Sequence, residues 1–173
     1  PPLFKNGENI DLIALRTKIA LEGHNKNVLD IYGKGWEEKI SKEDSRVGDW
    51  KSRKHELLRP YDFNLCFENT ISPNYMTEKI WDSIENYCLP VYFGKGTLVY
   101  DIFPEDSFID YSNFNEPSEL FEYVNRMSNL EYINRLNKCI DIYNQKSKTF
   151  ETWRKKSRTQ ILDNIIYKLN NIT

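Results

Sequence analysis

Short apolar runs alternate along the chain with longer stretches that carry an apolar residue every three or four positions. The short runs predict buried strands and the longer stretches predict amphipathic helices. The predicted strands cover residues 28–32, 64–68, 89–93 and 107–110. The predicted helices cover 50–58, 77–86, 117–127 and 130–143, preceded by one that Asn9 or Asp11 caps and that ends near Glu22, and followed by a closing helix at about 150–170. Residues 33–49, with their glycines and mixed charges, read as a loop.

Strands that alternate with helices favour parallel pairing, because parallel neighbours need a long crossover between them. We therefore expect an α/β fold with a Rossmann-like parallel sheet flanked by helices. A chain of 173 residues without a repeat or a clear linker predicts a single domain over residues 1–173.

The composition agrees with one core under a polar surface, since 39% of the residues are hydrophobic and the mean hydropathy is −0.68. A net charge of −2 gives no general field that would attract nucleic acid, so we expect no nucleic-acid partner. No apolar run approaches the roughly 20 residues that span a bilayer. The chain begins at Pro1 without a methionine, so we expect a piece of a longer protein and membrane association only through segments beyond it.

The three cysteines are widely spaced and form no CxxC pair, which argues against a disulfide framework or a zinc site. Cys66 and Cys88 lie in or beside apolar runs and are expected to be core thiols. The only histidines, His24 and His55, have no acidic or cysteine partner at ligand spacing, so we expect no metal site.

The most informative stretch is 67–79, which leads from a predicted strand through a polar loop into the first turn of a helix. In open α/β sheets, ligands bind beyond the carboxyl ends of the strands. The stretch offers two carboxylates, an amide, a phenol and an ammonium group, from Glu68, Asn69, Tyr75, Glu78 and Lys79. Together these groups can satisfy a ribose, a base and a phosphate. The helix start favours phosphate, because its N–H groups are unpaired and carry partial positive charge.

Each of these residues also has a purely structural interpretation. Lys79 can be a solvated surface lysine, and Glu78 can stabilise its helix start instead of accepting the ribose hydroxyls. Tyr75 can pack at the helix entrance instead of touching the base or the sugar phosphate. Asn69 can close the loop through its backbone, and Glu68 can point into the crevice or into a buried pair. The Gly94-Lys95-Gly96 segment lacks the spacing of a phosphate loop and reads as a flexible turn.

The same region resembles a known family. Residues 61–70 (YDFNLCFENT) followed by 75–79 (YMTEK) are similar to the signature of the α1,3-fucosyltransferases, glycosyltransferase family ten. The likeness continues through 89–94 (LPVYFG) and 101–110, and upstream to Arg16 and the apolar run at 28–33. It covers roughly residues 10–143.

The resemblance implies a fold and a role. These enzymes have two Rossmann-like halves that face each other across a cleft, the GT-B arrangement. The carboxyl-terminal half binds GDP-fucose, and the amino-terminal half carries the acceptor contacts and the general base. The chain resembles only the donor-binding half. An amino-terminal acceptor domain is apparently absent, so the catalytic base is expected outside the chain, and the isolated chain is expected to be inactive alone.

The resemblance also implies site residues and partners. Lys79 and Arg16 would contact the diphosphate, although Arg16 can also be a packed stem with a solvated head. Asn69, Tyr75 and Glu78 complete the expected set of substrate-binding residues. The expected partners are a nucleotide-sugar donor and a glycan acceptor, and the family inverts configuration when it transfers fucose. No cofactor is expected and no metal is required, because the chain lacks an Asp-x-Asp motif.

Two alternatives to a GDP-fucose domain remain open at this point. The chain can belong to a family member that uses another nucleotide sugar, since the signature fixes phosphate and ribose chemistry better than base or sugar. It can also be a non-catalytic nucleotide-binding or interaction module. The expected location is the cytoplasm or a membrane surface in a bacterial or viral source, and the Golgi lumen in a eukaryotic one.

Overall fold

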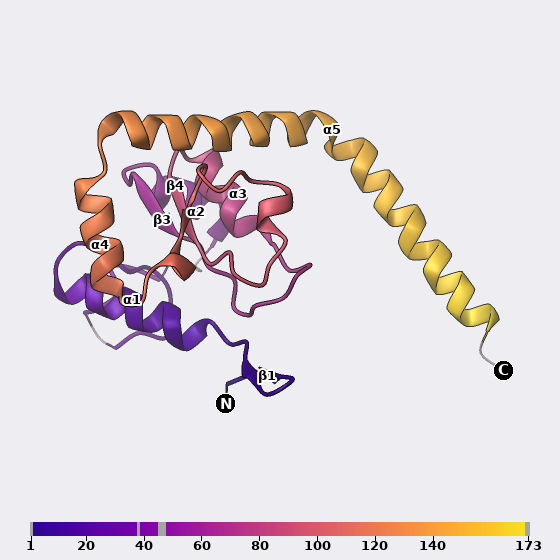
Figure 1. The fold of residues 1–173 in the computed structure, drawn as a ribbon, viewed down its shortest axis with the longest axis horizontal. Coiled ribbons are helices and arrows are strands. Elements are labelled where there is room, and N and C mark those ends of the chain that lie inside the picture. The colour runs from indigo at the N-terminus through magenta and orange to yellow at the C-terminus, as the bar shows by residue number, and fades with distance from the viewer. Residues whose placement is uncertain (1, 38, 45–47, 172–173) are drawn as a thin grey trace.

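A three-stranded parallel sheet lies at the centre of the molecule (Figure 1). The computed structural model describes residues 2–37, 39–44 and 48–171, and in the last helix it gives no side chains for residues 151, 153, 154, 156, 157, 160, 161 and 164. The sheet consists of β3 (Phe63–Leu65), β4 (Leu89–Tyr92) and β5 (Ile109–Asp110), in that order. Asn64 pairs with Pro90, and Val91 pairs with Ile109. The predicted strands at 64–68, 89–93 and 107–110 and their parallel pairing are confirmed.

Helices cover both faces of this sheet. They are α1 (Ile13–Asn25), α2 (Trp50–Leu58), α3 (Glu78–Glu85), α4 (Pro117–Arg126) and α5 (Asn129–Asn170), with 3₁₀ turns η1 (Val99–Asp101) and η2 (Tyr111–Asn113) after β4 and β5. All four residues of β4 are buried, as expected for a central parallel strand covered on both sides. α3 connects β3 to β4, and it packs against β4 and α5, whereas α1 packs against α4.

Successive residues of β4 pack in two different hydrophobic clusters, because successive side chains of a strand point to opposite faces of the sheet. Val91 joins a cluster that includes Ile19 of α1 and Leu120 of α4. Tyr92 joins the other cluster, which includes Ile80 of α3 and Cys139 of α5. The two clusters fix α1 and α3 against the sheet, so that the starts of both helices approach the carboxyl ends of β3 and β4.

The predicted strand at 28–32 is wrong. Val28 is 60% exposed and follows Asn27, whose φ of 56° turns the chain. Only Ile31 is buried, and its backbone makes an isolated bridge to Ser41 instead of pairing with β3. The apolar run was correctly identified, but a strand needs a partner, and this segment pairs with the following loop.

The amino terminus forms a small hairpin that we did not predict. β1 (Phe4–Lys5) pairs with β2 (Glu8–Asn9) in the antiparallel direction. Asn6 and Gly7 form the turn with φ values of 53° and 82°, and Asn-Gly is the residue pair that such tight hairpin turns favour. α1 then begins later than expected, at Ile13, whose N–H donates to Asp11 Oδ1 at 2.8 Å.

The two helices predicted at 130–143 and 150–170 are one helix, α5, of 42 residues. The Ser128 hydroxyl caps its start by accepting a hydrogen bond from the Glu131 N–H at 3.1 Å. Residues 144–149 contain no proline or glycine, so nothing interrupts the helix there. Its first part packs on α3, and its last part extends away from the rest of the molecule (Figure 1). In the part of the chain that the structure describes, no helix is long and apolar enough to cross a membrane.

Candidate functional site

The loop between β3 and α3 begins at the carboxyl edge of the sheet and is tied to the start of α1. The Leu12 N–H donates to the Asn69 carbonyl at 2.9 Å, and the Ile71 N–H donates to the Ile10 carbonyl at 2.8 Å. These backbone bonds hold the loop where ligands bind in open α/β sheets. Asn69 therefore does close the loop through its backbone, one of the two roles that the sequence allowed.

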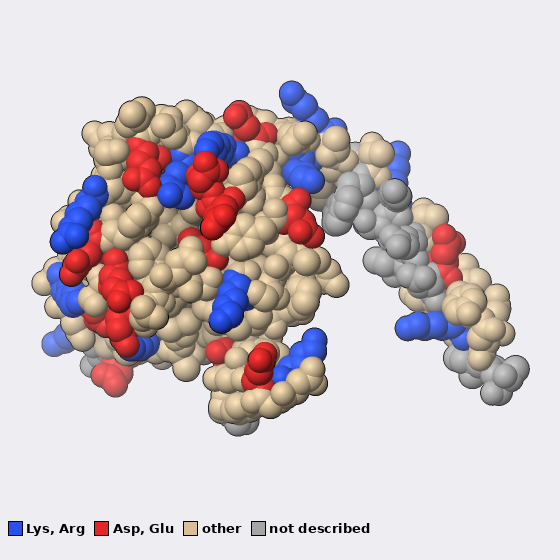
Figure 2. Space-filling model, in the orientation of Figure 1, with Lys and Arg blue, Asp and Glu red and all other residues tan. Residues whose placement is uncertain are grey.

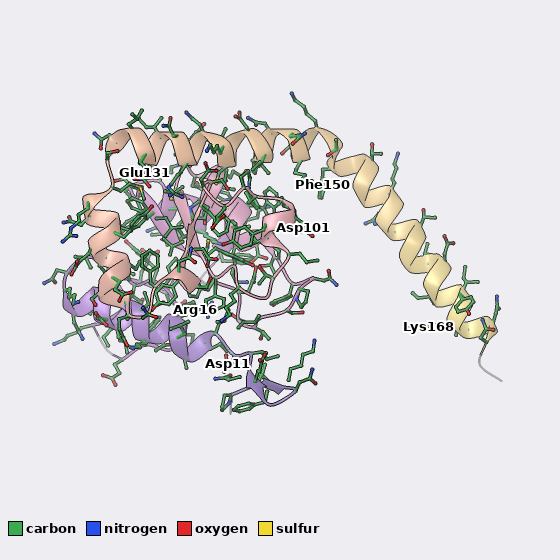
Figure 3. The ribbon with its side chains drawn as sticks, in the orientation of Figure 1. Asp11, Arg16, Asp101, Glu131, Phe150 and Lys168 are labelled. Atoms are coloured by element: carbon green, nitrogen blue, oxygen red, sulfur yellow. The ribbon has the colours of Figure 1, made fainter. Side chains whose placement is uncertain are left out.

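Arg16 reaches this loop from α1. Its Nη1 donates to the Phe67 carbonyl at 3.2 Å and to Asn69 Oδ1 at 3.1 Å. Arg16 is partly buried, and Figure 3 shows it on the side of α1 that faces the body of the molecule. The structure thus brings Arg16 and Asn69 together, although 53 positions separate them in sequence.

Glu68 forms the centre of a compact polar cluster with Thr77 and Lys79, which we call the Glu68 cluster. The Glu68 side chain is only 2% exposed. One carboxylate oxygen accepts from the Thr77 N–H at 2.7 Å and from the Thr77 hydroxyl at 2.8 Å. The other oxygen accepts from Lys79 Nζ at 2.8 Å. Of the two orientations that the sequence allowed for Glu68, the structure has the buried pair.

Lys79 is consequently no solvated surface lysine. Its side chain is 24% exposed, and its ammonium also donates to Thr77 Oγ1 at 2.9 Å. The residue lies in the first turn of α3, where free N–H groups already favour an anion. An ammonium group has three N–H donors, and the two contacts described here use two of them.

Glu78 and Tyr75 border this cluster and are exposed, Tyr75 to 39%. Partial burial alone would raise the pKa of Glu78, but its own backbone N–H and the charges of Lys79 and Lys54 hold the pKa below its ordinary value. Glu78 is therefore ionised at neutral pH. Its carboxylate can stabilise the helix start and can accept hydrogen bonds from a ligand, so both interpretations of this residue agree with the geometry.

The turn after β4 packs against the same loop, a feature that the sequence did not reveal. The Gly94 N–H donates to Asp110 Oδ1 at 2.8 Å, and a Cβ added at Gly94 would lie 2.5 Å from Asp110 Oδ2. The Leu98 N–H donates to the Pro73 carbonyl at 3.1 Å. The segment that we read as a flexible turn is therefore fixed at Gly94, and a glycine is required there by close approach.

Tyr92 and Asp110 are further polar residues at the strand ends that the sequence analysis overlooked. Asp110 is 6% exposed and is satisfied by the N–H groups of Gly94 and Ser112 and by the Tyr100 hydroxyl. The Tyr92 hydroxyl is buried without a hydrogen-bond partner among the described residues. Burial, and next the charge of Glu68, raise the pKa of Tyr92. In the sequence, Asp110 directly follows the apolar pair Phe108-Ile109 and Tyr92 lies near the end of the apolar run 89–93, and these positions were the available signal.

One group of side chains brings metal-binding atoms together away from this loop. Ligand atoms of His55, Asp82 and Glu85 lie within 4.8 Å of one another between α2 and α3, so His55 has the acidic neighbours that the sequence did not reveal. The Asn86 amide donates to the Asp82 carbonyl at 2.7 Å and lies 2.7 Å from His55 Nδ1. Lys54 pairs with Asp82 at 2.5 Å. These contacts already engage His55 and Asp82 and join the two helices.

A hollow of about 620 Å³ lies along β5, the edge strand at the opposite end of the sheet from β3. Its lining includes Glu105, Phe108, Tyr123 and Arg135, and none of the five predicted substrate-binding residues. The Arg135 guanidinium is committed to Glu131, to the Phe108 carbonyl and to the Tyr123 hydroxyl. Arg135 therefore joins α4 and α5 to the segment that precedes β5.

The cysteines take no part in the site. Cys66, Cys88 and Cys139 are buried free thiols, as expected for Cys66 and Cys88. Burial raises the pKa of the Cys66 and Cys139 thiols to about 12 and that of Cys88 to about 11. They are therefore protonated at neutral pH and are poor nucleophiles.

The surface charge gives no long-range attraction for an anion. Figure 2 shows Lys and Arg interspersed with Asp and Glu over the face in view, in agreement with the net charge of −2. Any affinity for a phosphate must therefore come from local groups, of which Lys79, Arg16 and the start of α3 lie at the loop.

Comparison with known proteins identifies the family. Residues 8–164 match the model for "Glycosyltransferase family 10 (fucosyltransferase) C-term". The chain is 39% identical over 79 residues to the alpha-(1,3)-fucosyltransferase FucT of Helicobacter pylori, across 44% of this chain and 16% of that protein. It is 32% identical over 119 residues to the human 3-galactosyl-N-acetylglucosaminide 4-alpha-L-fucosyltransferase FUT3, across 68% of this chain and 30% of that protein.

Solved structures agree with this result. A crystal structure of an alpha1,3-fucosyltransferase with GDP-fucose matches 71% of this chain with a TM-score of 0.56 and 26% identity, and the match covers 34% of that chain. A crystal structure with GDP matches equally well, at 27% identity. The chain thus spans about a third or less of the proteins that it matches. The predicted α/β fold of the GT-B type is confirmed, and the chain belongs to glycosyltransferase family 10, the fucosyltransferases, whose C-terminal part it matches.

Proposed function

We propose that this chain is the donor-binding domain of an inverting fucosyltransferase and that it binds GDP-fucose at the carboxyl ends of β3 and β4. The observation that carries the proposal is the placement of Lys79, which the Glu68 cluster holds in the first turn of α3. Arg16 approaches the same loop from α1. Two cations and a helix start in one place suit a diphosphate. The structural relative crystallised with GDP-fucose supports this choice of donor.

The remaining predicted residues fit the other parts of the donor. Glu78, ionised and exposed beside Lys79, would accept hydrogen bonds from the ribose hydroxyls. Tyr75, at the entrance to α3, would contact the base or the sugar phosphate. Asn69 would hold Arg16 in position through the hydrogen bond from Nη1 to Oδ1.

Transfer of fucose breaks the bond between the fucose anomeric carbon and the GDP oxygen while an acceptor hydroxyl attacks from the opposite face. Negative charge then develops on the leaving diphosphate, where Lys79, Arg16 and the N–H groups of α3 would stabilise it. The acceptor hydroxyl loses its proton to a base, which we expect outside this chain. The domain would therefore bind the donor and stabilise the leaving group without completing the transfer.

From the same arrangement we propose that the site binds the diphosphate without a metal ion. In many transferases a carboxylate-bound divalent ion neutralises the leaving diphosphate. At the loop of this chain the carboxylate of Glu68 is occupied by Thr77 and Lys79. The fixed cations would supply the neutralising charge instead, and we expect GDP to bind when divalent ions are chelated.

Titration calorimetry with GDP, GDP-fucose and UDP, in buffer with EDTA, tests the proposal. We expect saturable binding of GDP and GDP-fucose at one site. Equal or tighter binding of UDP would favour a member of the family that uses another nucleotide sugar. No binding of any nucleotide would contradict the proposal and favour an interaction module. Binding that vanishes on chelation and returns with Mn²⁺ would refute the metal-free mode.

A further inference from the structure

Glu68 places a buried negative charge beside the proposed diphosphate site, and binding of a diphosphate does not require such a charge. Its carboxylate lies directly behind the ammonium of Lys79, with 2.8 Å between Oε2 and Nζ, and is 2% exposed. A negative charge next to the main phosphate-binding cation opposes the binding of an anion. Such a charge also costs free energy to bury unless it is paired, so a role confined to packing would be served better by an apolar residue.

We propose that Glu68 acts on the donor diphosphate through Lys79: it partly neutralises the ammonium and so limits how tightly GDP is bound. The inference rests on the proposed function, since it concerns the same site. Because of Glu68, the domain would bind GDP less tightly and would release it faster after transfer.

The geometry allows Lys79 to keep its contacts with the Glu68 cluster while it binds a phosphate. Two of its three N–H donors point to Glu68 Oε2 and Thr77 Oγ1. Because the N–H groups of an ammonium point to the corners of a tetrahedron, a phosphate oxygen on the third donor would lie about 4.5 Å from Glu68 Oε2, beyond hydrogen-bond distance. At that separation the repulsion between two unit charges corresponds to about fivefold in affinity in bulk water, and it is larger at the lower effective dielectric of a protein surface, so we expect an effect of about tenfold.

The Glu68→Gln substitution separates the two roles of the carboxylate, which caps the start of α3 and neutralises Lys79. The amide oxygen can still accept from the Thr77 N–H, which Glu68 Oε1 does at 2.7 Å. The amide nitrogen would face Lys79, and it cannot accept a hydrogen bond. The start of α3 would keep its cap, while Lys79 would lose its counter-charge.

The test measures the affinity of Glu68→Gln for GDP, GMP and guanosine. We expect GDP to bind about tenfold more tightly than to the wild-type chain, GMP about threefold more tightly, and guanosine with unchanged affinity, because the repulsion grows with phosphate charge. Stopped-flow displacement should show slower release of GDP. The matched control is Glu85→Gln, which removes the same charge from the exposed end of α3 and should leave all three affinities unchanged.

The outcomes separate this inference from the proposed function. Wild-type chain that binds no GDP overturns both. Wild-type chain that binds GDP, together with a Glu68→Gln variant that binds it equally or more weakly, overturns only the inference. In a Lys79→Met background, Glu68→Gln should no longer strengthen binding of GDP, and a persistent gain would show that the carboxylate does not act through Lys79.

A second measurement applies if Glu68→Gln fails to fold. In the wild-type chain, the Lys79 ammonium should give an ¹H–¹⁵N signal protected from exchange with water, because the Glu68 cluster holds it. The signal should shift on addition of GDP and stay protected. A Lys79 ammonium that exchanges freely in the unliganded chain would overturn the inference.

Discussion

Replacing Lys79 by methionine removes its charge and keeps an unbranched stem of similar length. If Lys79 donates to the diphosphate, the variant loses a hydrogen bond to a charged group, which contributes about 1.5–3 kcal/mol. Binding of GDP should therefore weaken by about 10–150-fold. GMP, which carries less phosphate charge, should lose less, and guanosine should lose almost nothing.

The same substitution should also lower stability, for a reason that the structure makes quantitative. Glu68, 2% exposed, would keep the Thr77 N–H and hydroxyl as donors but would lose its counter-charge. Breaking a fully buried ion pair costs 3–5 kcal/mol, and Lys79 is 24% exposed, so we expect a loss of about 2–3 kcal/mol. For a domain of this size, that corresponds to a fall in Tm of roughly 5–10 °C.

Urea denaturation gives the stability, and calorimetry with the three ligands gives the affinities, all at one salt concentration and well below the lowered Tm. Lys146→Met is the matched control, because it removes the same charge from an exposed position on α5. Equal weakening for GDP, GMP and guanosine would refute the diphosphate assignment. Unchanged affinity for GDP, even with the expected loss of stability, would show that Lys79 pairs with Glu68 for stability and does not bind the diphosphate.

Four further predictions concern Glu78, Gly94 and the activity of the whole chain. Glu78→Gln should weaken GDP, GMP and guanosine by similar amounts, about 1–2 kcal/mol, and should not weaken 2′,3′-dideoxy analogues. Because the pKa of Glu78 is lowered in the folded chain, its carboxylate adds stability above its ordinary value of 4.5 that is lost as the pH falls through the lowered value, and Glu78→Gln should remove this part of the curve of Tm against pH. Gly94→Ala should cost about 1–3 kcal/mol in urea denaturation, because its Cβ would meet Asp110, whereas Lys95→Ala at the exposed next position should change stability little. The isolated chain should transfer fucose negligibly in a radiolabel assay, and sustained turnover would require a base among its own residues.

The sequence predicted the central βαβ unit well because its signals are local. The apolar runs that became β3, β4 and β5 are short, and each is followed by polar residues. The strand expected at 28–32 failed because pairing depends on partners far along the chain, which an apolar run does not specify. The Asn6-Gly7 turn shows the opposite case, a local signal that was present and overlooked.

The sequence proposed the candidate site residues but did not reveal the contacts between them. The sequence placed Glu68 and Lys79 at the two ends of one loop, yet only the fold shows that they form a direct ion pair to which Thr77 also hydrogen-bonds. The contact of Arg16 with Asn69 joins residues 53 positions apart and follows from the packing of α1 on the sheet. Contacts of this kind depend on the relative placement of elements, which periodicity does not report.

Amide chemical shifts of the ¹⁵N-labelled chain, recorded as GDP is added, would locate the donor site on the fold. We predict saturable shifts that cluster at Arg16, at Asn69 and at residues 75–79, with little change along the hollow beside β5. Shifts that gather instead at Phe108, Tyr123 and Arg135, or no shifts at all at saturating GDP, would contradict the placement of the donor site at the ends of β3 and β4.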